Sequence, residues 1–123
     1  MMAHEIVIDQ EKGIVRIVHK DIVLNHEMWG TSHALMGKLE GGRPPRILAD
    51  LRGAVLKIDD WEKQEFATAH QGVFMAGARI ALLIGEDDPH KKEFAFFAKL
   101  FSRGGVVVKV FNSEYAAEGW LAE

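Results

Sequence analysis

Histidine is the residue type with the widest chemistry in this chain, because its ring binds metal ions and transfers protons. The chain carries six, at His4, His19, His26, His33, His70 and His90. His26 and His33 lie about two turns apart on one predicted helix, too far for two ligands of one zinc ion. His26-Glu27 begins the metalloprotease pattern, but Gly30 stands where the second histidine is required. The sequence therefore predicts no metal site.

His70 is the histidine best placed for acid–base chemistry. It follows Phe66 by about one helical turn and so lies beside the apolar stripe of its predicted helix. A general base and a hydrogen-bonded histidine at the border of the core both fit this position, and we favour the second. No nucleophile paired with a base is visible among Ser32, Ser102 and Ser113. We therefore expect no catalytic triad and no enzymatic activity.

A charged segment follows the third predicted strand. Asp50, Arg52 and Gly53 come where that strand ends, and ligands of open α/β sheets gather beyond the carboxyl ends of parallel strands. Two interpretations stand: a binding site for something polar, or an internal salt bridge that pins the loop. Glycine-rich phosphate loops are not expected, because Gly104-Gly105 precedes a strand and not a helix. No cofactor is predicted.

The third predicted helix is unusually aromatic. Its large apolar side chains are Phe94, Phe96, Phe97, Leu100 and Phe101. At about 100° per residue they cover roughly 200° of the helix, about twice what a one-sided surface helix needs. If Phe94, Phe97 and Phe101 face the sheet, Phe96 and Leu100 point away from it. They would then form a homodimer surface, a wall of an apolar pocket, or a contact with a neighbouring helix. Such a pocket would lie near Trp61 and Phe66.

The elements that must position these residues alternate strands with helices. Strands are expected over residues 5–8, 14–19, 46–51, 79–84 and 106–111. Helices are expected after the N-caps Asn25, Asp59, Asp88 and Ser113, and the first three end before Gly41, Gly77 and Gly104. The buried stripe of the second helix is predicted at Trp61, Phe66, Ala69 and Val73. The order β-β-α-β-α-β-α-β-α predicts an α/β fold. Its five-stranded sheet is mixed and mostly parallel, with an N-terminal antiparallel hairpin and about four helices.

Composition narrows the class of protein. The 123 residues fit one domain, which we expect to span residues 1–123. The net charge of −3 argues against a nucleic-acid-binding protein, and the chain lacks cysteine and therefore disulfides. No apolar run approaches the roughly 18 residues of a transmembrane helix. The start of the chain has no secretory pattern, so a cytoplasmic location is expected.

In this order of elements, the chain resembles the SpoIIAA-like family, relatives of the STAS domains of sulfate transporters and anti-sigma factor antagonists. The resemblance rests on residues 47–53, residues 79–83, and the tail with residues 108–111, Ala116-Ala117 and Trp120-Leu121. The antagonists carry a phosphorylatable serine just after the third strand. Here Asp50 and Gly53 match that stretch, but Leu51 and Arg52 replace the serines. The known phosphoryl switch has no hydroxyl to act on.

The resemblance implies a small non-catalytic module that binds a partner or a ligand. Our first expectation is a binding or regulatory module that acts through protein–protein contacts and forms a homo-oligomer, most simply a dimer. The alternative is a carrier of a small apolar ligand such as a lipid or fatty acid. The candidate binding residues are Asp50, Arg52, Gly53, Trp61, His70, Phe96 and Leu100.

Overall fold

Strands and helices follow one another along the chain much as the apolar pattern predicts. The computed structural model describes residues 4–39, 42–70, 72–74, 76–102 and 105–123. The strands are β1 His4–Asp9, β2 Ile14–His19, β3 Asp21–Leu24, β4 Arg46–Asp50, β5 Ala54–Lys57, β6 Arg79–Leu83 and β7 Val107–Phe111. The helices are α1 Asn25–Met36, α2 Asp60–Ala69, α3 Lys91–Phe101 and α4 Glu114–Leu121. Gly41 and Gly104, expected at helix ends, lie outside the described residues.

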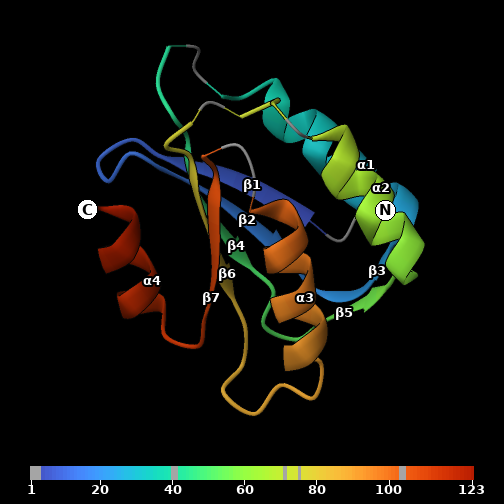
Figure 1. The fold of residues 1–123 in the computed structure, drawn as a ribbon. Coiled ribbons are helices and arrows are strands. Elements are labelled where there is room, and N and C mark those ends of the chain that lie inside the picture. Colours follow the sequence, from blue (N-terminus) through green and yellow to red (C-terminus); the bar gives the residue numbers. More distant parts are fainter. Residues whose placement is uncertain (1–3, 40–41, 71, 75, 103–104) are drawn as a thin grey trace.

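The main sheet has five strands in the order β1-β2-β4-β6-β7 (Figure 1). β1 and β2 are antiparallel and joined at Gly13, whose φ of +68° is one that glycine adopts without strain. The other neighbouring pairs are parallel. β4 and β6 occupy the centre because their apolar residues are covered on both faces. The predicted mixed sheet with an antiparallel edge is confirmed.

Helices cover the two faces of the sheet unequally (Figure 1). α4 packs on one face, where Leu48, Ala81, Leu83 and Leu121 are buried together. The opposite face carries the larger core, to which α1, α2 and α3 all contribute. Alternation along each strand explains the division, since neighbouring residues of a strand point to opposite faces.

Two short strands absent from the predicted order form a second, parallel sheet of β3 and β5. Each has four residues, and Ile22 and Leu24 on β3 are 52% and 42% exposed. Strands this short, in which apolar residues stand at exposed as well as buried positions, leave little periodic signal in the sequence. β3 follows β2 directly and β5 follows β4 after a short turn, so the small sheet continues the pairing of β2 with β4 beyond a bend.

Helix starts agree only in part with the predicted caps. The capping-box contact at α2 is present, because the Asp59 amide donates to Glu62 Oε1 at 2.9 Å, and Ser113 Oγ accepts from the Ala116 amide. Asn25 is instead the first residue of α1, and the Leu24 amide donates to the Glu27 side chain. The predicted cap at Asp88 is also wrong. Its side chain accepts from the His90 amide at 2.8 Å, which makes a turn before α3 begins at Lys91.

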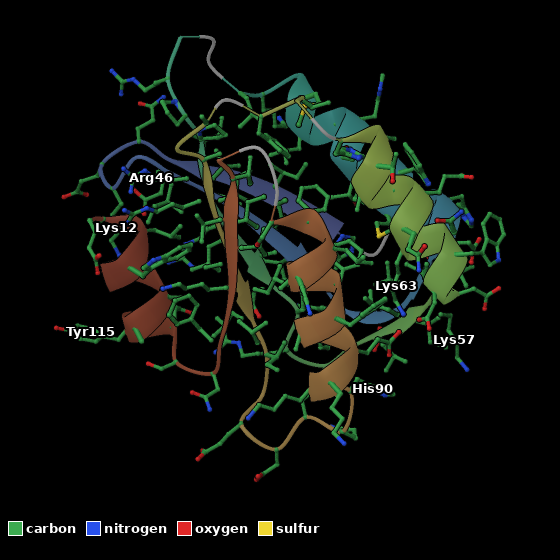
Figure 2. All side chains as sticks on the ribbon, in the orientation of Figure 1. Lys12, Arg46, Lys57, Lys63, His90 and Tyr115 are labelled. Atoms are coloured by element: carbon green, nitrogen blue, oxygen red, sulfur yellow. The ribbon has the colours of Figure 1, made fainter. Side chains whose placement is uncertain are left out.

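α4 is held to the sheet by arginines as well as by its apolar face. Arg79 Nη1 donates to the Trp120 carbonyl at 2.7 Å, and Arg46 donates to the Leu121 carbonyl. These groups satisfy carbonyls at the helix end that have no partner within the helix. Glu118 on the same helix accepts from Arg16 at 2.6 Å and from Lys12 at 2.9 Å. Figure 2 shows Lys12 and Arg46 on the α4 side of the molecule.

We expect Leu121→Ala to destabilise the protein strongly. Leu121 is 1% exposed and fills the space between α4 and the sheet, so its truncation leaves a cavity that costs about 2–5 kcal/mol. Urea denaturation measures the loss as a lower midpoint. Tyr115→Ala on the same helix is the matched control, because Tyr115 is 90% exposed and its removal changes the free energy of unfolding by at most about 0.5 kcal/mol. Equal losses in the two variants would contradict this packing.

Candidate functional site

Two residues of the charged segment at the end of β4, Asp50 and Arg52, form an ion pair with each other. Arg52 Nη2 lies 2.7 Å from Asp50 Oδ2, while its Nε and its amide nitrogen both donate to Asp50 Oδ1. Arg52 also reaches Glu114 Oε1 on α4 at 3.2 Å. Gly53 then takes a φ of +82°, which lets the chain turn sharply into β5. Of the two interpretations, the internal salt bridge is the one that the geometry displays.

The electrostatics of Asp50 follow from this pairing. Burial raises the pKa of its carboxyl group, but the hydrogen bonds and charge of Arg52, with a smaller contribution from Arg16, outweigh burial and hold the pKa below its ordinary value. Asp50 is therefore an ionised partner within the fold, and its two oxygens are occupied by Arg52.

A cavity of about 130 Å³ lies on the opposite face of the same bend, between the sheet and the three helices α1, α2 and α3. Its lining residues are Ile17, His19, Val23, Met28, Thr31, Ser32, Ile47, Ala49, Leu51, Leu56, Phe66, Ile80, Leu82, Phe94 and Phe97. All but His19, Thr31 and Ser32 are apolar. Val23 and Leu56 come from β3 and β5, so the small sheet closes one end of the cavity.

His70 lies next to this cavity and is hydrogen-bonded to two of its wall residues. Its Nδ1 is 2.6 Å from the Phe66 carbonyl oxygen, and its Nε2 is 2.5 Å from Ser32 Oγ. The ring is packed between aromatic rings, with centroids 4.1 Å from Phe66 and 5.6 Å from both Trp29 and Phe101. The expected hydrogen-bonded histidine at the border of the core is present.

Ser32 is the site residue that the sequence analysis did not select. It follows Met28 by four residues and Trp29 by three, which places its hydroxyl on the inward side of α1. A small polar residue within an apolar stripe is a weak signal, and its partner His70 lies 38 residues away along the chain.

Trp61 lies away from the cavity, contrary to the predicted stripe. It is 62% exposed and Val73 is 48% exposed, whereas α2 buries Lys63, Phe66 and Ala67. Trp61 precedes Phe66 by five residues, which at about 100° per residue turns it about 140° from the buried face. Ala69 is exposed as well, and Val73 lies beyond α2, which ends at Ala69 and does not continue towards Gly77. Of the predicted stripe only Phe66 is buried.

Trp61 and Phe96 line an open surface cleft between α2 and α3, together with Asp59, Asp60, Lys92 and Glu93. Lys63 is 2% exposed at this cleft, and its Nζ lies 2.7 Å from Glu93 Oε1, which ties the two helices together (Figure 2). Phe96 and Leu100 are both half-buried. The aromatic side chains of α3 thus line two different sites: Phe94 and Phe97 line the cavity, and Phe96 lines the cleft.

Within the described residues no group of three or more His, Asp or Glu side chains is arranged to hold a metal ion. The same part of the chain contains no helix with the length and apolarity required to cross a bilayer.

We expect Arg52→Gln to raise the pKa of Asp50, because it removes the bonds and the charge that lower this pKa and leaves the burial that raises it. An NMR titration of the Asp50 carboxyl carbon measures the change. Arg43→Gln is the matched control, since Arg43 is exposed and outside this ion pair. An unchanged Asp50 pKa in Arg52→Gln would contradict the assignment.

The same ion pair predicts a pH dependence. A carboxyl group whose pKa is lowered on folding stabilises the fold above its ordinary pKa, and this stabilisation disappears as the pH falls through the lowered value. The difference in unfolding free energy between wild type and Arg52→Gln should therefore be present at neutral pH and shrink below about pH 4. Because Arg52 is half exposed, the difference at neutral pH should stay under about 1 kcal/mol.

Comparisons with known proteins bear on the architecture. A scan against models of protein families finds no match, and neither does a search of curated proteins. The chain is similar to a solved structure, that of an uncharacterized protein of the DUF3478 family from Shewanella loihica PV-4, described as having a SpoIIAA-like fold. The two share 18% identity and superpose with a TM-score of 0.65, covering 97% of this chain and 92% of that one. The protein therefore has the SpoIIAA-like fold that its sequence resembles.

Proposed function

We propose that the protein is a binding module that holds a small apolar ligand in the cavity between the sheet and helices α1, α2 and α3. The observation that carries the proposal is the cavity itself, about 130 Å³ in volume and lined almost wholly by apolar side chains. An apolar cavity of about 150 Å³ stays dry and binds benzene in another protein, so this volume suits a ligand of about six carbon atoms. It is too small for a long fatty-acid chain.

The few polar groups on the wall give the ligand an orientation. Ligand sites are typically apolar with a small number of polar groups that set direction and specificity. Here Ser32 on α1 and His19 on β2 line the cavity, and Thr31 Oγ1 donates to the Glu27 carbonyl at 3.0 Å within its own helix. A ligand with one polar end and a compact apolar body fits this distribution.

Benzene should raise the melting temperature of the wild-type protein, because a ligand that binds only the folded state stabilises it. Ala49→Leu should abolish the rise, since Ala49 lines the cavity and the larger side chain fills the space. Ala95→Leu is the matched control, because it makes the same change at an exposed position of α3. A thermal melt with and without benzene measures each variant. Equal shifts in wild type and Ala49→Leu would sink the proposal.

A second proposal concerns the surface cleft of Trp61 and Phe96. We infer that this cleft is a contact surface for a second copy of the chain, as expected from the aromatic α3. The supporting observation is Trp61, 62% exposed beside half-buried Phe96. Tryptophan is enriched among the residues that carry most of the energy of protein interfaces.

Native mass spectrometry over a range of concentrations tests this contact. Wild-type protein should form dimers, and Trp61→Ala should raise the dimer dissociation constant at least tenfold because it removes the central anchor. Tyr115→Ala is the matched control: it removes an aromatic side chain that is 90% exposed on α4, away from the cleft. A wild-type monomer at every concentration, or equal effects of the two variants, would refute the contact.

A further inference from the structure

The hydrogen bonds of His70 orient its ring towards Ser32 as a proton acceptor. The Phe66 carbonyl oxygen can only accept, so the Nδ1 atom 2.6 Å away must carry the ring hydrogen. In the neutral ring Nε2 then has a lone pair, and Ser32 Oγ, 2.5 Å away, donates its hydrogen to it. A serine that donates to a histidine whose other nitrogen is held by an acceptor is the arrangement of an activated nucleophile.

The surroundings hold this arrangement in place. His70 is the C-cap of α2, and its amide donates to the Phe66 and Ala67 carbonyls at 3.2 Å, which fixes the backbone that carries the ring. The rings of Phe66 and Phe74, with centroids 4.1 and 6.5 Å from the imidazole, restrict its rotation. Ser32 itself lies on the wall of the apolar cavity, so a group seated there is next to the hydroxyl.

We propose that Ser32 is a nucleophile that accepts a short acyl group from an ester, with the apolar acyl chain seated in the cavity. The inference rests on the proposed function, because the acyl chain occupies the site of the small apolar ligand. It adds a covalent reaction to that binding and names the substrate class as short-chain acyl esters.

The reaction balances without any further reagent. Ser32 Oγ forms a bond to the ester carbonyl carbon while its proton moves to His70 Nε2. The bond from that carbon to the alcohol oxygen breaks, and the alcohol leaves with the proton from His70. Water then attacks the acyl-serine, with His70 accepting a proton from it and returning that proton to Ser32 Oγ. The sum is an ester and water giving a carboxylic acid and an alcohol.

The test uses p-nitrophenyl butyrate and the full chain. Its acyl group is smaller than benzene and fits the cavity, and its good leaving group makes the attack by serine the step that is measured. Intact-protein mass spectrometry after brief incubation should show one butyryl group, and peptide mapping should place it on Ser32. Ser32→Ala and His70→Gln should lower the labelling rate at least tenfold. Ser113→Ala removes a serine on the other side of the sheet and should label as wild type does.

The outcomes separate the nucleophile from the binding site, because benzene binding is measured on the same samples. A butyryl group on Ser32 of the wild type, with labelling at least tenfold slower in His70→Gln than in Ser113→Ala, supports the proposal. Labelling of the Ser32→Cys variant at residue 32 also supports the proposal. This result is independent of whether His70→Gln folds. If the wild type binds benzene but acquires no label, or is labelled only on lysines, Ser32 is not a nucleophile and the proposed binding function still stands. Wild type that neither binds benzene nor labels overturns both.

Discussion

The architecture depends on two parallel strands leaving the main sheet together. β2 and β4 pair side by side, and their continuations β3 and β5 pair again after a bend. At one strand the bend passes through Asp21, whose φ of +59° is uncommon for a residue with a side chain. At the other it passes through Gly53. The small sheet that follows the bend contributes Val23 and Leu56 to the wall, so the cavity lies where the two sheets meet beneath the helices.

The polar residues on the cavity wall come from the end of β2 and from α1. His19 is the last residue of β2 and points to the face that carries α1, so it lines the cavity while remaining 7% exposed. Ser32 reaches the wall from α1 and is satisfied by His70 from α2. Ser32 and His70 are both half-buried, so their bond links α1 to α2 and contributes the modest stability of a hydrogen bond, about 1 kcal/mol.

The sequence predicts those parts of the fold that rest on long apolar runs and local caps. β4 and β6 are identified by continuous apolar residues, and α2 and α4 by the caps at Asp59 and Ser113. It does not predict β3 and β5, whose four residues each gain their order from pairing with one another. It also misses the Ser32–His70 pair, because periodicity identifies the inward face of each helix but not which helices meet.

The bend has two sides, and they differ in chemistry. On the α4 side, Asp50 and Arg52 neutralise each other, and Arg52 also contacts Glu114. On the other side, Ala49, one residue earlier on the same strand, faces the apolar cavity. Since neighbouring residues of a strand point in opposite directions, a change of residue type at Asp50 or Arg52 leaves the cavity wall intact. The ion pair at the end of β4 and the apolar cavity are therefore independent features of the two faces, and the cavity does not depend on the ion pair.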